Sequence, residues 1–422
     1  MKIIADLQVH SRFARATSKD ITLESLEKYA RIKGLGLLGT ADFQHPQWNK
    51  EIKKALREDD NGILWSKTGF PFIWQTEISL MYSQGGKGRA VHVLVYAPDT
   101  IIADRIISYL GSKGRLDYDG RPIFGMSVHD AVRDLKAISD DIEIIFAHCM
   151  TPFFGVYGSK SGFDSLKECL GDQADKVYAV ESGMSADPGM LWRFKEQFNV
   201  VSFSDAHSMW PWRIGREATI FDVPKLTYRN VMHAIRTGDG LAGTIETPPA
   251  YGRYHWDGHR DCGFESSPEE TKRLDGICPK CGKKLIIGVD YRVEELAKEP
   301  DGYRPRGAKP YYTLVPLHEL IAFHLGTSLL SSKKVWAIYD ALIHRFGTEF
   351  SILLDAKEDN LSAALHGDEA LVRLIMLNRE AKLPIRPGYD GVYGRINLPA
   401  GDPEGPRQEP DRGQKGLSGF LG

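Results

Sequence analysis

Short apolar runs that end in metal-ligand residue types recur through the first half of the chain, and they constrain its fold more than any other feature. The first run, residues 3–5, leads into Asp6, Gln8 and His10, which the alternation of a strand places on one face. Later runs end in, or contain, residues of the same types. These are Asp42, His45, Glu77, His92, His148, Asp205 and His207.

Strand ends that face one rim build the active site in parallel α/β barrels. A single His or Asp at a strand end is usually a hydrogen-bonded structural residue. Repetition of such ends in order along the chain instead favours one common cluster, and imidazole and carboxylate are suitable ligands for divalent metals. We therefore predict an α/β barrel with a multi-metal site that draws on all ten residues, from Asp6 to His207. Asp6, Asp42 and His45 are either further ligands or groups that support the ligands. The predicted catalytic residues are His10, Asp42, Glu77 and Asp205.

Composition limits the class of protein and its compartment. A chain of 422 residues with 42% hydrophobic and 26% charged residues is typical of a soluble protein of two or three domains. The net charge of -2 neither indicates nor excludes nucleic-acid binding. Five cysteines, three of them clustered, favour metal binding in a reducing compartment. Because no apolar run is long enough to span a bilayer, we expect a cytoplasmic protein with no membrane partner.

A second metal site is indicated near the middle of the chain. Two knuckles with two intervening residues each, His259 to Cys262 and Cys278 to Cys281, are separated by fifteen residues. This spacing matches a four-ligand zinc ribbon with histidine in one of the thiolate positions. His255 is a competing choice for the fourth ligand. The pattern predicts one structural zinc ion, which would fix a module too small to bury a core of its own.

Basic and aromatic side chains follow the ligand motifs and are candidates for DNA or phosphate contacts. Guanidinium groups bind phosphate oxygens in pairs, and aromatic rings stack on bases. Ordinary surface arginines and rigid structural loops are the competing interpretations. The candidates are Arg12, Arg15, Tyr157, Trp210, Arg213, Tyr389 and Tyr393.

The last residues resemble a sliding-clamp interaction motif. Residues 401–422 are rich in Gly and Pro, so we expect a disordered tail. The tail ends in Gln414, Leu417, Phe420 and Leu421, a pattern that would fold on binding and place its apolar residues in a pocket of a PCNA-type clamp.

The order of the ligand types resembles that of the PHP (polymerase and histidinol phosphatase) metallo-phosphoesterases. This resemblance implies a distorted (β/α)7 barrel with about two or three divalent ions, which can be Zn, Mg or Mn. The chain departs from the family pattern at two positions. Gln8 stands where the first histidine of a His-x-His motif is usual, and Asp42 is separated from His45 by two residues instead of being adjacent to a histidine.

A PHP barrel followed by a ribbon and the segment Pro387–Gly394, PGYDGVYG, resembles the endonuclease Q family over nearly the whole chain. The resemblance implies a DNA repair endonuclease that cuts 5′ of deaminated bases (uracil, hypoxanthine, xanthine) and abasic sites in double- or single-stranded DNA. The alternatives are a phosphatase for a small phosphorylated metabolite and an inactive DNA-binding module. The expected domains are the barrel (1–245), the zinc ribbon (246–300), an α-rich DNA-binding domain (301–400) and the tail (401–422).

Overall fold

The computed structural model describes residues 1–196 and 198–397. The chain divides into two units: Met1–Glu246 with Arg292–Tyr312, and Thr247–Tyr291 with the chain from Thr313 onward. The first unit contains the predicted barrel, and the second contains the predicted zinc ligands and the helical C-terminal region. The domain limits expected from the sequence stay predictions.

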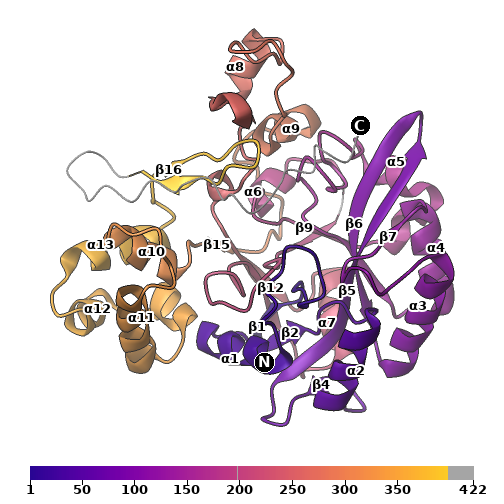
Figure 1. Cartoon of the computed structure of the whole chain (residues 1–422), viewed down its shortest axis with the longest axis horizontal. Helices are drawn as coiled ribbons and strands as arrows, with labels where there is room; N and C mark the ends of the chain where they lie inside the picture. Colours follow the sequence, from indigo (N-terminus) through magenta and orange to yellow (C-terminus); the bar gives the residue numbers. More distant parts are fainter. Residues whose placement is uncertain (197, 398–422) are drawn as a thin grey trace. The chain divides into compact units, whose positions relative to one another are not determined.

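A curled mixed sheet forms the first unit and confirms the α/β prediction (Figure 1). Its main path through the described residues runs β10-β9-β8-β6-β5-β2-β1-β11-β12-β15. The pairs β1–β2, β2–β5, β8–β9 and β9–β10 are parallel, whereas β5–β6, β6–β8, β1–β11 and β11–β12 are antiparallel. The strands are β1 (Lys2–Asp6), β2 (Leu37–Gly39), β3 (Arg57–Glu58), β4 (Leu64–Trp65), β5 (Pro71–Gln84), β6 (Lys87–Ala97), β7 (Ile123–Phe124), β8 (Glu143–Phe146), β9 (Ala179–Glu181), β10 (Asn199–Val201), β11 (Ala218–Asp222), β12 (Leu241–Glu246) and β15 (Tyr311–Thr313).

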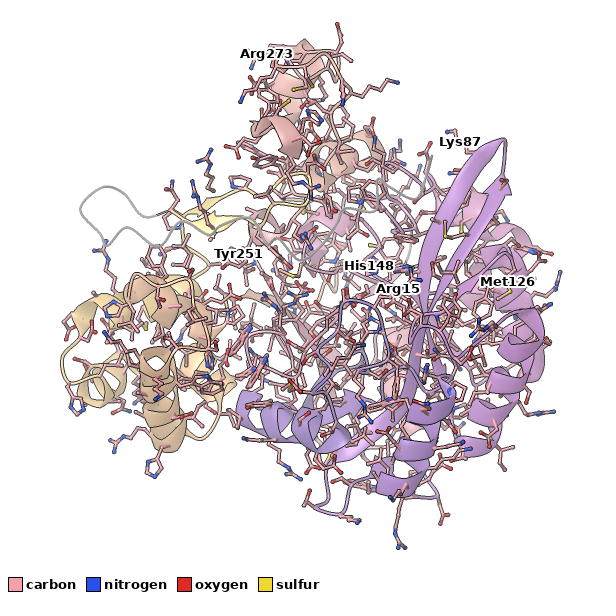
Figure 2. All side chains as sticks on the ribbon, in the orientation of Figure 1. Arg15, Lys87, Met126, His148, Tyr251 and Arg273 are labelled. Carbon is pink, nitrogen blue, oxygen red and sulfur yellow. The ribbon has the colours of Figure 1, made fainter. Side chains whose placement is uncertain are left out.

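The longest strands, β5 and β6, form an antiparallel hairpin. Lys87 lies at the tip of this hairpin (Figure 2). Because β5 is buried along most of its length, Glu77 enters the interior from the middle of a strand, where its main chain is held by cross-strand pairing with Leu94.

Helices of the first unit begin and end at recognisable capping residues. The first helix has a capping box between Thr22 and Ser25 and ends at Gly34, whose φ of 100° suits glycine. These two caps set the limits of the helix. The helices are α1 (Leu23–Lys33), α2 (Pro46–Ala55), α3 (Thr100–Lys113), α4 (Val128–Ile138), α5 (Leu166–Leu170), α6 (Pro188–Leu191), α7 (Tyr228–Thr237) and α9 (Val289–Leu296), the last of which spans a boundary between the units.

The core of the first unit lies among the strands and α7. It includes Leu7, Ile73, Ile145 and Val201, one from or beside each of several strands, and all four are fully buried. Burial of such aliphatic side chains contributes about 1.5–3 kcal/mol each. The same segments end in the ligand-type residues, so the core fixes the positions from which those residues project.

The second unit contains helices and short two-stranded sheets. His318 packs against the rings of Trp336 (centroids 4.5 Å apart) and Tyr339 (3.8 Å). Within the described ranges, no helix of either unit combines the length and apolar character that a membrane span needs. The elements are β13 (Asp257–His259), β14 (Phe264–Ser266), α8 (Pro268–Arg273), α10 (Leu317–His324), α11 (Lys333–Phe346), α12 (Glu358–Ala364), α13 (Glu369–Arg379), β16 (Ile385–Arg386) and β17 (Arg395–Ile396).

Candidate metal centre

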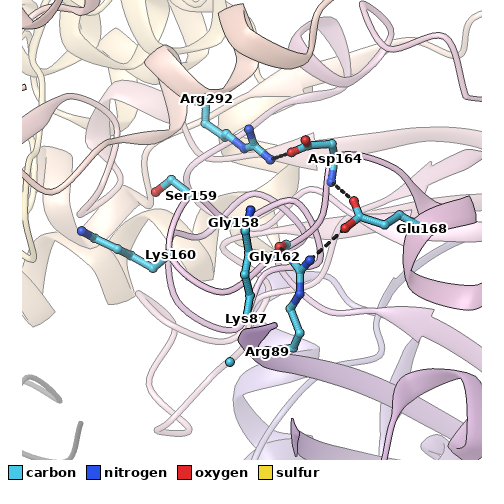
Figure 3. Close-up of a pocket in the computed structure, with 10 residues that line it drawn as sticks. Lys87, Arg89, Gly158, Ser159, Lys160, Gly162, Asp164, Glu168 and Arg292 are labelled. Carbon is cyan, nitrogen blue, oxygen red and sulfur yellow. Dashed lines mark hydrogen bonds and ion pairs between the residues drawn. The ribbon is translucent and has the colours of Figure 1, made fainter. Parts of the chain in front are cut away.

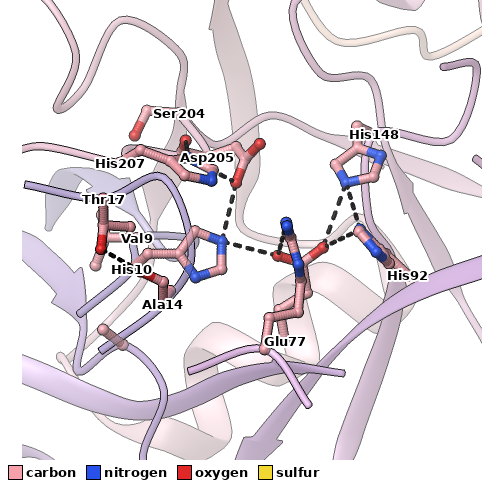
Figure 4. A network of polar contacts seen from close by, with 12 residues as sticks. Val9, His10, Ala14, Thr17, Glu77, His92, His148, Ser204, Asp205 and His207 are labelled. Carbon is pink, nitrogen blue, oxygen red and sulfur yellow. Dashed lines mark hydrogen bonds and ion pairs between the residues drawn. The ribbon is translucent and has the colours of Figure 1, made fainter. Parts of the chain in front are cut away.

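Six of the predicted ligands converge at one place in the first unit (Figure 4). They form two groups, and within each group the ligand atoms lie within 4.8 Å of one another. One group is Glu77, His92 and His148, and the other is His10, Asp205 and His207. Residues that are distant in the sequence are thus brought together by the ends and middles of neighbouring strands.

Glu77 is the centre of the first group. Its Oε1 lies 2.7 Å from His92 Nδ1 and 3.3 Å from His148 Nε2, and those two nitrogens are 3.2 Å apart. The edge of a tetrahedral site with ligand bonds near 2.1 Å measures about 3.4 Å. The three atoms are therefore spaced like the ligands of a single ion.

His10 joins the two groups. Its Nε2 lies 2.9 Å from Glu77 Oε2 and 3.0 Å from Asp205 Oδ1. His207 completes the second group, with its Nδ1 3.7 Å from Asp205 Oδ1 and its ring 4.7 Å from that of His10. Two adjacent sites that share a bridging region have the arrangement of a multi-metal centre.

Backbone strain is concentrated at this centre. Ala41, His148, Phe154 and Asp205 have positive φ values between 31° and 66°, which are costly for residues other than glycine. Two of these residues are ligand candidates, and Phe154 stacks on a third, with its ring 4.2 Å from that of His92. The fold holds these side chains in positions that an unstrained strand end would not give.

Charge interactions within the centre set its protonation. Burial opposes the ionisation of Asp205, but the neighbouring His207 and a hydrogen bond from His10 outweigh it and hold the pKa of Asp205 below its ordinary value. Glu77 follows the same pattern, since His92 and Arg121 overcome burial and hold its pKa well below the usual range. Burial lowers the pKa of His92 to about 3 and that of His207 to about 4. The carboxylates next to His10 act in the opposite direction and, despite its burial, raise the pKa of that imidazole. Divalent metals bind ionised carboxylates and neutral imidazoles, so metal binding at His10 would release a proton.

Asp42 and Glu181 orient two ligand candidates through atoms that face away from the other ligands, His10 Nδ1 and the main-chain N–H of His148. Asp42 Oδ1 lies 2.9 Å from His10 Nδ1, while its Oδ2 accepts hydrogen bonds from Ser11 N (2.7 Å) and Ser11 Oγ (2.6 Å). Glu181 Oε2 accepts a hydrogen bond of 2.6 Å from the main-chain N–H of His148. A carboxylate on the far ring nitrogen fixes the tautomer of a metal-binding histidine. Asp42 thus holds His10 Nε2 toward the other ligands, and its own role as a ligand stays a prediction.

Three other predicted ligands lie outside both groups. Asp6 is fully buried, accepts hydrogen bonds from Ser204 N (3.0 Å) and Gly215 N (2.9 Å), and has a pKa raised by burial to about 6. His45 stacks on Phe13, with ring centroids 4.3 Å apart. Gln8 is fully buried, and neither atom of its side-chain amide has a hydrogen-bond partner among the described residues. Their roles as ligands stay predictions.

The predicted phosphate-binding arginines occupy different settings. Arg12 pairs with Glu51 at 2.6 Å and lies over the ring of Phe13, so its guanidinium is held in packing. Arg15 keeps 64% of its side chain exposed and pairs with Asp119 at 3.1 Å. Arg213 is half-buried beside the Trp212 carbonyl oxygen. Only Arg15 of the three combines high exposure with a position just beyond the His10 motif.

The predicted aromatic contacts of the barrel are mostly internal. Tyr157 is 1% exposed and donates its hydroxyl to Glu196, so its ring is not accessible for base stacking in this structure. Trp210 stacks on Trp212 with centroids 5.3 Å apart and also contacts Tyr29 of α1. These rings pack the loops that carry them onto the barrel.

The four predicted zinc ligands converge in the second unit. His259, Cys262, Cys278 and Cys281 form a group of the kind that holds a metal, with His259 Nδ1 3.3 Å from Cys281 Sγ. The pKa of Cys278 is lowered to about 7 despite burial, because main-chain N–H groups and His259 stabilise its thiolate. This set of one imidazole and three thiolates fits zinc. His255 is not part of the group.

Two further predicted contacts lie at the end of the described chain. Tyr389 and Tyr393 are half-buried in the turn between β16 and β17, and Arg253 lies 5.0 Å from the centroid of the Tyr393 ring. The predicted clamp motif, Gln414, Leu417, Phe420 and Leu421, lies outside the described residues.

One residue that the sequence did not single out is Arg121, in the loop between α3 and β7. Its Nη1 lies 3.5 Å from Glu77 Oε2, and its side chain is 24% exposed. Nothing in the surrounding sequence, RLDYDGRPI, distinguishes it from the other arginines of the chain. Its role depends on a loop conformation that only the structure provides.

A separate polar cavity of about 130 Å³ lies beside the β5–β6 hairpin (Figure 3). Arg89 and Arg292 both line it, but Arg89 Nη2 pairs with Glu168 at 2.8 Å and Arg292 pairs with Asp164. Both guanidinium groups are therefore neutralised by carboxylates of the protein. The cavity is accordingly no candidate for the reaction centre.

Comparison with known proteins gives two solved structures that match nearly the whole chain. The lesion-specific endonuclease PfuEndoQ from Pyrococcus furiosus is 30% identical, with a TM-score of 0.83, over 95% of this chain and 96% of that one. An endonuclease Q in complex with a 27-mer duplex carrying an abasic lesion at its active site is also 30% identical, with a TM-score of 0.85 and coverage of 96% and 98%.

Two sequence matches are consistent with this likeness. Residues 316–382 match the family described as MJ0043 C-terminal domain. Protein MJ0043 of Methanocaldococcus jannaschii is 32% identical over 294 residues, which make up 68% of this chain. The chain spans about a third of the length of that relative, since the match covers 35% of it.

The α/β sheet and its paired ligand groups, together with these matches, define a metal-dependent endonuclease. Identity of 30% over nearly the full length of both chains is decisive for the family. The chain belongs to the endonuclease Q family.

Proposed function

We propose that this chain is a DNA repair endonuclease that hydrolyses the phosphodiester bond on the 5′ side of deaminated bases (uracil, hypoxanthine, xanthine) and of abasic sites. The observation that carries the proposal is the pair of ligand groups joined by His10 Nε2, which lies 2.9 Å from Glu77 Oε2 and 3.0 Å from Asp205 Oδ1. Family membership supports the substrate, because one relative was solved with a duplex that contains an abasic lesion.

About two or three divalent ions, when bound, would supply an ionised water near neutral pH and stabilise charge on the attacking and leaving oxygens. Glu77, His92 and His148 would hold one ion, and His10, Asp205 and His207 another. Asp42 would keep the tautomer of His10 that leaves Nε2 free to bind. The candidate ions are Zn, Mg and Mn, since imidazole ligands suit Zn and carboxylate ligands suit Mg and Mn.

Recognition of the lesion would require the damaged nucleotide to leave the base stack, which costs least when pairing is already weak. The side chains proposed to contact DNA are the exposed Arg15 in the first unit and the Tyr389 and Tyr393 turn in the second. The ribbon would hold one structural zinc ion through His259, Cys262, Cys278 and Cys281. The terminal motif from Gln414 to Leu421 would bind a PCNA-type sliding clamp.

A panel of substrates tests this function. End-labelled duplexes with one uracil, hypoxanthine, xanthine or abasic site are incubated with Mg²⁺ or Mn²⁺, beside an undamaged duplex and p-nitrophenyl phosphate. We expect a single break 5′ of each lesion, no break in the undamaged duplex, and no break after chelation of the metal. Hydrolysis of the phosphomonoester with no cleavage of any duplex would instead make the chain a metabolite phosphatase.

Clamp binding has its own test. A peptide of residues 408–422 is titrated with a PCNA-type clamp and followed by fluorescence anisotropy. We expect saturable binding that Phe420→Ala abolishes, since that ring would fill the apolar pocket. Equal binding of the wild-type and variant peptides would contradict this part of the proposal.

A further inference from the structure

Arg121 brings a positive charge to the junction of the two ligand groups. Its Nη1 lies 3.5 Å from Glu77 Oε2, the same oxygen that faces His10 Nε2 at 2.9 Å. The side chain is 24% exposed, and its Nη1 faces the centre. An arginine at this position is close enough to act on any anion that the ligand groups bind.

The loop that carries Arg121 is fixed from several sides. Arg121 N donates a hydrogen bond of 3.0 Å to Asp119 Oδ1, and the Gly120 carbonyl oxygen accepts one of 2.6 Å from Gln44 Nε2. Gly120 N also donates to the main-chain oxygen of Phe13 at 3.1 Å. The loop is therefore bound to the segments that carry Asp42 and His10, which pre-organises Arg121 relative to the centre.

The contact between Arg121 and Glu77, at 3.5 Å, is longer than those that Glu77 makes with three histidines. The carboxylate has closer contacts with His92 (2.7 Å), His10 (2.9 Å) and His148 (3.3 Å). The carboxylates that act most strongly on the guanidinium are Glu77 and Asp205, which bound metal ions would neutralise, and the next, Asp119, is paired with Arg15. The guanidinium would then be available to another anion. A phosphate oxygen is the anion whose geometry best matches its fork of N–H donors.

We infer that Arg121 binds a non-bridging oxygen of the phosphate group that is held at the metal centre. The inference deepens the proposed function by naming a substrate-binding residue, but it requires only a phosphate ester and not a particular lesion. Arg12 does not compete for this role, because Glu51 and the Ile21 carbonyl oxygen hold its guanidinium.

Binding of inorganic phosphate to the Mn²⁺-loaded full chain tests the inference without any DNA. Isothermal titration compares the wild type with Arg121→Gln and with Arg121→Lys. The matched control is Arg115→Gln, which removes an arginine of the same loop that is 75% exposed and pairs with Asp117. We expect Arg121→Gln to weaken phosphate binding about ten- to a hundredfold, since a charge-assisted hydrogen bond is lost. Arg121→Lys should weaken it several-fold, and Arg115→Gln should have no effect.

Metal content separates phosphate binding from a purely structural role. If Arg121 binds the substrate phosphate, Arg121→Gln should bind as many Mn²⁺ ions as the wild type and no more weakly. Wild-type phosphate affinity in Arg121→Gln, or a parallel loss of bound Mn²⁺ that accounts for the weaker phosphate binding, would overturn the inference. Should Arg121→Gln fail to fold, wild-type phosphate affinity in Arg121→Lys would overturn it equally.

The outcome is distinguishable from failure of the proposed function. If no lesion-containing duplex is cleaved but Arg121→Gln still weakens phosphate binding, the substrate class is wrong and the role of Arg121 stands. If lesion cleavage is observed and phosphate binding is unaffected by the substitution, the function stands and the role of Arg121 does not.

Discussion

The substitution Asp42→Asn tests how the centre is oriented. In the wild type, Asp42 Oδ2 accepts from Ser11 N and Ser11 Oγ, and Oδ1 faces His10 Nδ1 at 2.9 Å. An asparagine that keeps its oxygen on Ser11 turns its NH₂ toward His10 Nδ1. His10 must then accept at Nδ1 and carry its proton on Nε2, the atom that faces Glu77 and Asp205.

The cost of this change follows from the chemistry of ligand tautomers. A proton on His10 Nε2 occupies the lone pair that would bind the metal. To bind the ion, His10 must move this proton to Nδ1, and it then loses its hydrogen bond to Asn at position 42. Loss of such a supporting partner weakens metal affinity about 10–100-fold, or about 1.4–2.7 kcal/mol. Isothermal titration of the chelator-stripped protein with Mn²⁺ measures it directly.

A matched control and a refuting result complete this test. Asp99→Asn replaces the N-cap of α3, where Asp99 Oδ1 accepts from Ile102 N and asparagine caps equally well. The control should bind Mn²⁺ like the wild type. Unchanged affinity in Asp42→Asn would refute the orienting role, and complete loss of one bound ion would identify Asp42 as a direct ligand.

Three other perturbations test separate parts of the molecule. Burial raises the pKa of Asp6 to about 6. The protonated carboxyl therefore stabilises the folded, metal-free protein. This contribution is complete below pH 3.8, the ordinary pKa, and is lost as the pH rises through about 6. Urea unfolding should show a fall of about 1 kcal/mol between pH 5 and 7 that is absent in Asp6→Asn, and an identical fall in the variant would contradict the assignment. Gly120→Ala places a Cβ against Asp42 Oδ2 and 2.8 Å from Ala14 N, which would displace the carboxylate that orients His10. Calorimetric titration should therefore show weaker Mn²⁺ binding, and wild-type affinity would contradict this expectation. Cys278→Ser removes one of four ligands, and elemental analysis should find one zinc fewer per chain with the Mn²⁺ sites retained; an unchanged zinc content would exclude the ribbon site.

The convergence of the candidate metal ligands could be predicted from the sequence because strand periodicity and residue type are both local signals. His10, Glu77 and Asp205 follow from apolar runs that end in, or contain, ligand types, and the structure brings them together. The capping residues of the helix that begins after Thr22 are local signals of the same kind.

Side-chain roles that depend on tertiary contacts could not be predicted in this way. The sequence left open whether Asp42 is a ligand or supports one, and its contact with His10 Nδ1 is visible only in the structure. Tyr157 follows a ligand motif but turns into the core to meet Glu196. Arg121 approaches Glu77 only because its loop is bound to Phe13 and Gln44, which are distant in the sequence.

The most direct measurement is nicking of an end-labelled duplex with one uracil or abasic site by wild-type protein, Asp205→Asn and the control Asp172→Asn. Asp172 is exposed and pairs with His129, away from the centre. We predict a Mn²⁺- or Mg²⁺-dependent break immediately 5′ of the lesion, unchanged in the control and slowed about a hundredfold or more in Asp205→Asn. Equal cleavage of damaged and undamaged strands, or wild-type activity in Asp205→Asn, would contradict the account.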